Sequence, residues 1–115
     1  MNIREYAYLG DAVWEMFVRE FILERHLNSK ELHDEVTSRV RACYQHALLE
    51  KIEELLTAEE HDIARRARNL SIPIGRRSIQ KDYRQATAFE AIIGFWYKTN
   101  PARLKEFEEI LTKYL

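Results

Sequence analysis

Glycine and proline are nearly absent from this chain: its 115 residues contain three glycines and two prolines. A fold made only of strands needs many turns, and turns depend on these two residue types. The common charged and aliphatic residues here lose little rotamer freedom in a helix. The sequence therefore predicts an all-α fold of about six helices. Its length is enough for one buried core, so we expect residues 1–115 to form a single domain.

Two features indicate the cellular setting. The single cysteine, Cys43, cannot form a disulfide within the chain, and we expect it to be a small buried hydrophobic residue. No apolar leader follows Met1, and no apolar run approaches the roughly 18 residues of a membrane span. We expect a soluble, cytoplasmic protein that does not cross a membrane.

The first helix is predicted from residue 3 to about residue 26, because apolar residues recur there every three or four positions. Its inward face is expected to carry Tyr6, Leu9, Val13, Met16 or Phe17, and Phe21. Gly10 lies inside this helix, where glycine costs about 1 kcal/mol relative to alanine. We infer that Gly10 admits a close neighbour, either another backbone or a ligand.

Periodicity and capping residues predict five more helices, over residues 32–40, 42–56, 58–69, 82–98 and from 101 onward. Ser29 is expected to cap the second helix, and Leu48, Leu49, Ile52 and Leu55 to face inward from the third. Thr57 and Glu60 form a capping box for the fourth helix. Asn100 and Pro101 occupy the N-cap and first position of the last. Residues 70–81 lack helical periodicity and are predicted to form a basic loop.

Positive charge is concentrated between residues 65 and 84, although the whole chain has a net charge of -1. This segment has a single acidic residue, Asp82, and its net charge is +6, which leaves -7 on the rest of the chain. Its basic residues are Arg65, Arg66, Arg68, Arg76, Arg77, Lys81 and Arg84. Charge gathered in this way indicates an anionic partner.

Two carboxylates stand apart from the many charged residues of the solvated helix faces. Asp11 and Glu90 lie in apolar helical surroundings, where a carboxylate is costly unless it is paired or binds a metal. Glu15 follows Asp11 by four residues and so shares its helix face. A hard divalent cation would relieve the repulsion between them, and an arginine partner is the equal alternative.

Other kinds of chemistry find no support in the sequence. The four histidines never occur in a ligand spacing such as His-x-x-x-His, and no serine lies in a nucleophile elbow. There is no glycine-rich phosphate loop either. Zinc chemistry, acyl-enzyme chemistry and nucleoside triphosphate hydrolysis are therefore not expected.

Two motifs carry a family resemblance. Residues 8–13, Tyr-Leu-Gly-Asp-Ala-Val, resemble the signature motif of the ribonuclease III catalytic domain, and residues 89–94, Phe-Glu-Ala-Ile-Ile-Gly, resemble its C-terminal acidic motif. The whole chain is similar to Mini-ribonuclease III, whose members lack a double-stranded RNA-binding domain. The similarity runs in order through residues 7–15, residues 32–45 (Leu32, His33, Thr37, Val40, Ala42 and Gln45), 65–69, 83–87 and 89–94.

The resemblance implies an all-helical homodimeric endonuclease that hydrolyses double-stranded RNA with magnesium and matures the large-subunit ribosomal RNA precursor. By position, Asp11 and Glu90 are its metal-binding catalytic carboxylates. The longer enzymes carry two further acids where this chain has Ala7 and Thr87, a loss shared with the Mini subfamily. Glu15 could help to complete the metal shell, or it could pair with Arg19 four residues on and only stabilise the helix.

The resemblance also suggests roles for the basic segment and for the first helix. The seven basic residues of that segment are candidates for RNA binding, since A-form RNA is read largely through phosphates and 2′-hydroxyls. Arg84 either approaches the reacting phosphate or pairs with Asp11 or Glu15. Tyr8 is expected at the dimer interface. The alternative is that Tyr6, Tyr8 and Trp14 fill the core of one subunit.

Two other functions are compatible with the sequence. A catalytically inactive duplex-RNA-binding dimer on the same fold would account for the missing acids. A helical protein-interaction module would use its arginine cluster to bind an acidic partner. Magnesium-dependent cleavage separates the first from an enzyme, and retention on duplex RNA with its salt dependence separates the second.

Overall fold

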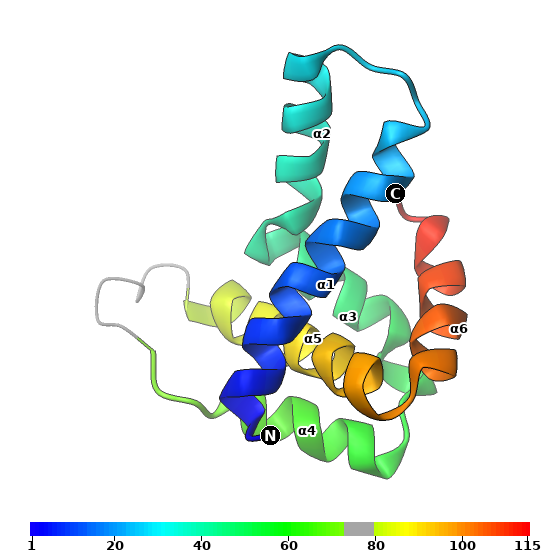
Figure 1. The fold of residues 1–115 in the computed structure, drawn as a ribbon. Coiled ribbons are helices and arrows are strands. Elements are labelled where there is room, and N and C mark those ends of the chain that lie inside the picture. Colours follow the sequence, from blue (N-terminus) through cyan, green and yellow to red (C-terminus); the bar gives the residue numbers. More distant parts are fainter. Residues whose placement is uncertain (73–79) are drawn as a thin grey trace.

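The fold of this chain was obtained as a computed structural model, which describes residues 1–72 and 80–115 (Figure 1). These residues form six α-helices and one short 3₁₀ helix, without a strand, as the sequence predicted. The elements are α1 (Ile3–Leu23), α2 (Ser29–Val40), α3 (Ala42–Ile52), η1 (Glu53–Leu55), α4 (Ala58–Arg68), α5 (Gln80–Thr99) and α6 (Pro101–Thr112). None of the described helices is long and apolar enough to cross a membrane.

Side-chain caps define where most helices begin. The capping box of Thr57 and Glu60 at α4 is confirmed, and Asn100 caps α6 with Pro101 in its first turn. The predicted cap of the second helix is wrong by one residue. Asn28 has the extended backbone of an N-cap and its side chain accepts from the Glu31 amide, so Ser29 is already helical.

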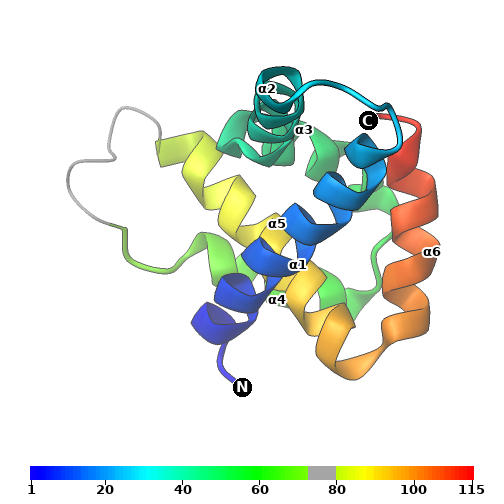
Figure 2. The ribbon, with the colours of Figure 1, turned by 45° about the horizontal axis from the view of Figure 1, so that its top comes forward.

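Helix α5 is the centre of the fold, and α1 crosses it directly (Figures 1 and 2). Two glycines stand at the crossing. A Cβ atom on Gly10 would lie 1.7 Å from the carbonyl oxygen of Glu90, and one on Gly94 would lie 2.0 Å from the carbonyl oxygen of Tyr6. The neighbour that Gly10 admits is therefore another backbone, one of the two alternatives that its position left open.

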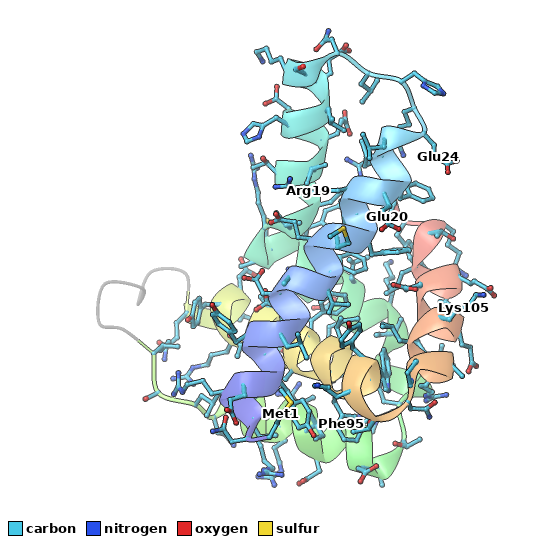
Figure 3. The ribbon with its side chains drawn as sticks, in the orientation of Figure 1. Met1, Arg19, Glu20, Glu24, Phe95 and Lys105 are labelled. Atoms are coloured by element: carbon cyan, nitrogen blue, oxygen red, sulfur yellow. The ribbon has the colours of Figure 1, made fainter. Side chains whose placement is uncertain are left out.

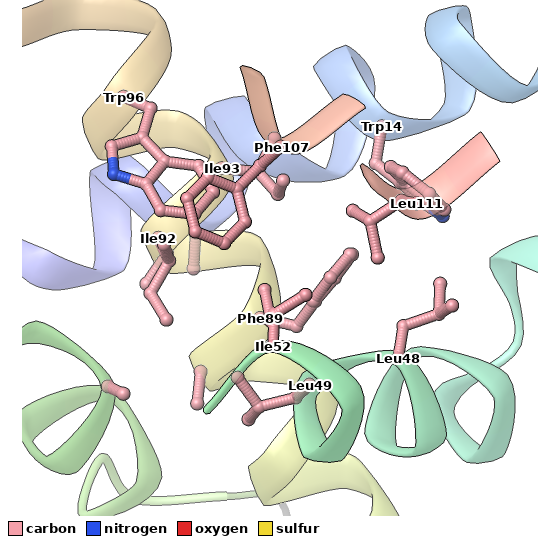
Figure 4. Packing of buried hydrophobic residues seen from close by; sticks show 14 of the residues in the cluster. Trp14, Leu48, Leu49, Ile52, Phe89, Ile92, Ile93, Trp96, Phe107 and Leu111 are labelled. Carbon is pink, nitrogen blue, oxygen red and sulfur yellow. The ribbon is translucent and has the colours of Figure 1, made fainter. Parts of the chain in front are cut away.

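The hydrophobic core gathers on α5 (Figure 4). Phe89 and Trp96 of α5 are fully buried, and the Phe89 ring meets Trp14 of α1 edge to face with centroids 5.0 Å apart. Further along α5, Trp96 packs against Phe107 of α6. These large rings bury much apolar surface and give the pairs a preferred geometry.

The most buried face of α1 differs from the predicted one. The predicted stripe is only half-buried, and Met16 is 60% exposed. Because α5 crosses at Gly10, the face on the glycine side enters the core instead. Its members are Ile3, Ala7, Gly10, Trp14, Val18 and Ile22.

Three smaller predictions are also wrong. Cys43 is exposed, because the inward face of α3 is taken by residues such as Leu48 and Leu49. Leu55 is 53% exposed, because α3 ends at Ile52 and the 3₁₀ turn that follows changes the period. Gln80 and Lys81 belong to α5 rather than to a loop, since α5 begins before Asp82. Residues 73–79 of the predicted loop lie outside the described residues.

A buried ion pair joins α4, α5 and α6, and no sequence pattern indicated it. The Glu60 carboxylate, only 5% exposed, accepts hydrogen bonds from Arg103 at 2.8 and 3.0 Å and from the Trp96 indole at 2.6 Å. Burial by itself raises the Glu60 pKa, but bonds from Arg103, the Thr57 amide and Trp96 outweigh it and hold the pKa at about 2.

Candidate active site

Asp11 and Glu90 meet beside the crossing of α1 and α5. Asp11 follows Gly10 along α1, and the Gly10 backbone lies against the carbonyl of Glu90. Their two side chains are joined by a hydrogen bond. Asp11 is exposed and Glu90 is half-buried, so the pair faces solvent from one side. The close approach that the glycines permit thus also sets the distance between the two carboxyl groups.

The surroundings of Glu90 disfavour its ionised form. Burial raises its pKa to about 9, with further increases from the hydrogen bond and the charge of Asp11, while a hydrogen bond from Gln45 acts in the opposite direction. In the metal-free protein at neutral pH, Glu90 is therefore protonated and donates to the Asp11 carboxylate. Asp11 and Glu90 would be able to hold a cation together once Glu90 has lost this proton to solvent.

The pair opens into a cavity of about 180 Å³ between α1, α5 and the segment that follows α4. Its lining combines cationic, aromatic and hydroxyl side chains with the two acids. The lining residues are Arg4, Ala7, Tyr8, Asp11, Ala67, Leu70, Ser71, Ile72, Tyr83, Arg84, Thr87 and Glu90. Acidic ligands beside positive charge suit a phosphate ester bound together with a metal ion.

The donor set around the two acids is small. Among residues 1–72 and 80–115, no group of three or more histidine, cysteine, aspartate or glutamate side chains could hold a metal. Thr87 lines the cavity where the longer enzymes carry an acid, and its hydroxyl donates to the Tyr83 carbonyl at 2.8 Å. Two carboxylates still fit magnesium, which prefers oxygen ligands and keeps several waters.

Glu15 lies outside this pair. Its carboxylate is 2.8 Å from the guanidinium of Arg19, four residues on in the same helix. The structure thus shows the ion pair that the sequence left as the alternative to metal binding. Arg19 is exposed and Glu15 is partly exposed, so this bridge contributes little to stability.

Gln45 is the site residue that had no assigned role. It lies on α3, is 1% exposed, and forms a hydrogen bond with the Glu90 side chain. The sequence marked Gln45 only as one position of the similarity to Mini-ribonuclease III and as a polar residue among the inward-facing positions of a helix. Such a position does not reveal which group the side chain meets.

The described contacts of Arg84 are not the ion pair with Asp11 or Glu15 that was one of its two alternatives, and its approach to a phosphate stays a prediction. Its guanidinium donates to the backbone carbonyls of Arg68 and Leu70, the latter at 3.1 Å. It therefore holds the chain that leaves α4 against α5. Arg84 still lines the cavity, but the contacts described here are with backbone rather than with Asp11 or Glu15.

The described residues of the basic segment lie where α4 ends and where α5 begins (Figure 2). Arg65 and Arg66 are exposed and share Asp62, at 2.7 and 3.8 Å. Arg68 is half-buried and donates to Gln85 at 3.3 Å.

Of the remaining basic residues, Lys81 is exposed in the first turn of α5. Arg76 and Arg77 lie outside the described residues. Within the described part of the segment, Arg65, Arg66 and Lys81 therefore offer the most exposed positive charge.

The three aromatic residues of α1 differ in their environment. Trp14 is 1% exposed and belongs to the core, and the Tyr6 ring packs edge to face on Phe95 at 5.5 Å. Tyr8 is 85% exposed. The core alternative thus holds for Trp14 and Tyr6, while Tyr8 is free to contact another molecule.

Comparisons with a protein-family model and with related sequences all indicate the same family. The ribonuclease III domain family matches residues 4–101. The Mini-ribonuclease 3 of Thermosynechococcus vestitus is 38% identical over 109 residues, which cover 95% of this chain and 72% of that protein. The Mini-ribonuclease 3 of a Synechococcus strain is 42% identical over 99 residues, covering 86% of this chain and 72% of the relative.

A solved structure also resembles the fold. An X-ray crystal structure of a protein from Fusobacterium nucleatum superposes with a TM-score of 0.86 at 35% sequence identity. The match covers 97% of this chain and 92% of the other. The similarity in sequence and the similarity in structure therefore both extend over nearly the whole length of this chain.

Proposed function

The chain belongs to the ribonuclease III domain family, and from this premise we propose that it is a magnesium-dependent endoribonuclease that cleaves double-stranded RNA. One observation carries the proposal. Two helices that cross at glycines bring Asp11 and Glu90 into contact at the edge of a cavity that also contains arginine side chains. Residues 1–115 would act as one catalytic domain.

Asp11 and Glu90 are the residues that would hold the magnesium ion. A bound magnesium ion supplies an acidified water and neutralises charge that develops on the phosphate. To serve as a metal ligand, Glu90 would have to release to solvent the proton that it donates to Asp11. Arg4, at the cavity wall, is 3.5 Å from the Ser71 hydroxyl and has its positive charge available for a phosphate oxygen. Hydrolysis would leave a 5′ phosphate and a 3′ hydroxyl.

The substrate would be bound mainly through its phosphates. Arg65, Arg66 and Lys81, exposed at the end of α4 and the start of α5, suit contacts with the A-form backbone, and Arg76 and Arg77 are proposed as further RNA-binding residues from their charge alone. By the resemblance to Mini-ribonuclease III, the natural substrate would be the large-subunit ribosomal RNA precursor in the cytoplasm.

Incubation of the protein with duplex RNA, with and without magnesium, tests the proposal. We expect wild-type cleavage only with magnesium, and loss of cleavage by at least about 100-fold in Asp11→Asn and in Glu90→Gln, because each removes a metal ligand at constant volume. Unchanged cleavage in either variant would overturn the site.

The same assay separates the other functions. Duplex binding by the wild-type protein without any magnesium-dependent cleavage would favour the inactive RNA-binding dimer. Failure to bind duplex RNA at all would favour the protein-interaction module.

We propose further that a second copy of the chain covers the outer face of α1. Four large hydrophobic residues are exposed along this face: Met1 at 57%, Tyr8 at 85%, Met16 at 60% and Leu23 at 55%. A groove on this face is lined mainly by apolar residues of α1, with Tyr97 of α5 and Leu104 of α6, and Glu20 and Glu108 also line it. So much exposed apolar surface is unusual for a monomer and is typical of an interface.

The charges on the same face are self-complementary. Glu5 and Arg19 stand seven residues before and after Ala12, and both are exposed. In an antiparallel pair of α1 helices centred on Ala12, Glu5 would face the partner's Arg19. Tyr8 would face the partner's Met16. A two-fold axis makes both contacts twice.

Light scattering at micromolar concentration tests the dimer. We expect a dimer for the wild-type protein and a monomer for Met16→Glu, because a charge would be buried at the interface without a partner. Leu55→Glu is the matched control, since Leu55 is 53% exposed on another element. A wild-type monomer with full activity would rule the interface out.

A further inference from the structure

Gln45 is one of two buried polar or charged residues among the described part of the chain, the other being Glu60. Its neighbours on the inward face of α3 are Leu48, Leu49 and Ile52. An amide in such surroundings costs free energy unless its donors and acceptor are satisfied. A specific pair of partners must therefore account for its burial.

Those partners lie on two different elements. The Gln45 amide nitrogen donates to the carbonyl of Val40, at the end of α2, over 3.4 Å. The same side chain forms a hydrogen bond with the carboxyl of Glu90 on α5. A glutamine amide has two N–H donors, so one can be used for each partner. The Val40 carbonyl thereby fixes the rotation of the amide that faces Glu90.

We propose that Gln45 is a positioning residue, whose amide holds the Glu90 carboxylate in the orientation that binds metal together with Asp11. The inference rests on the proposed function of the Asp11 and Glu90 pair. With only these two acids in the described site, a swing of either one loses half of the protein ligands. Hydrogen bonds from outside the ligand set commonly orient ligands in this way, and their removal weakens metal binding about 10–100-fold.

The alternative is that Gln45 only satisfies the Val40 carbonyl and joins α2 to α3. In that case its replacement would lower stability and leave metal binding unchanged. In the positioning role, metal affinity falls even where stability is retained. The two roles are therefore separated by measuring both quantities on one variant.

The experiment uses Gln45→Met, which keeps the unbranched shape of glutamine and removes both donors. Binding of manganese or magnesium alone to the RNA-free protein is measured by calorimetry, beside the thermal unfolding temperature in a chelator. We expect the metal Kd to rise about 10–100-fold. Excess magnesium should restore cleavage, because the ligands themselves remain.

Gln85→Met is the matched control. Gln85 lies on the same helix as Glu90, and its side-chain oxygen accepts from Arg68 rather than from a metal ligand. This variant should keep the wild-type metal Kd. If Gln45→Met does not fold, Gln45→Asn is measured instead, because it retains the buried amide but withdraws it by one carbon.

Two failures can be told apart. If the wild-type protein neither binds metal nor cleaves RNA, the proposed function fails. If the wild-type protein does both and the Gln45 variant has the wild-type metal Kd, the positioning role of Gln45 is overturned.

Discussion

Glu90 sets how the metal-free protein responds to pH. Its pKa is about 9 in the fold against an ordinary value of 4.5, so the folded protein keeps a proton that the unfolded chain releases between these values. Stability of the metal-free protein should therefore fall as pH rises from about 4.5 to 9. Glutamine has the shape of the protonated acid and never ionises, so Glu90→Gln should not show this fall.

Thermal unfolding in a chelator, from pH 5 to pH 9, checks this prediction. The two proteins should unfold at similar temperatures near pH 5. At pH 8 the variant should unfold at least about 4 °C higher, which is roughly 1 kcal/mol for a domain of this size. Parallel pH profiles for the two proteins would show that Glu90 is ionised in the fold.

Single residues differed in how well the sequence revealed them. Asp11 and Glu90 could be selected because each is a charge in apolar helical surroundings. Gln45 could not, because an amide on an inward face shows no partner until α3 and α5 are packed. The sequence left the role of Glu15 undecided, because a residue four positions from Asp11 and four from Arg19 can bind a metal with the first or pair with the second. The Arg19 side chain, 2.8 Å from the Glu15 carboxylate in the structure, shows the ion pair.

At the scale of helices, the crossing of α1 over α5 predicts that Gly10→Ala destabilises the protein, although helix propensity alone would predict a stabilisation. Gly10→Ala would gain about 1 kcal/mol from propensity alone. In the fold, the new Cβ would lie 1.7 Å from the Glu90 carbonyl oxygen, which is backbone and cannot move aside. The helices must separate, so we expect a loss of at least about 3 kcal/mol in urea unfolding, or failure to fold. An increase in stability would contradict this crossing.

Helices were predicted better than the way they pack. The period of 3.6 and the capping residues gave the existence and order of all six described helices, because both signals are local. The buried face of α1 was displaced, because several faces of that helix are apolar and only contact with α5 selects one. The Glu60 and Arg103 pair was missed for the same reason, since its members are 43 residues apart.

For the whole molecule, the distribution of charge and apolar surface relates the site to its partners. Tyr8, on the exposed face of α1, and Arg84, from the basic segment, both line the cavity that contains Asp11. A second copy on α1 would place the partner beside the site. In a two-fold dimer, the two sites would then lie near one another on a single duplex.

Replacement of Arg76 and Arg77 by alanine should weaken duplex RNA binding nearly regardless of sequence. Each phosphate contact releases counterions from the RNA on binding. Loss of one contact should therefore reduce the slope of log affinity against log salt concentration by about 0.9 unit, with double-stranded DNA as the guide.

Arg65 and Arg66 are the second pair to replace, and a smaller effect on affinity is expected because both pair with Asp62. Lys105, on α6 away from the described residues of the basic segment (Figure 3), and Lys113, the residue that follows α6, form the control pair. Affinity is measured at several salt concentrations without magnesium, so that no cleavage intervenes. If the Arg76 and Arg77 variant keeps both the affinity and the salt slope of the wild-type protein, these two residues do not contact the RNA.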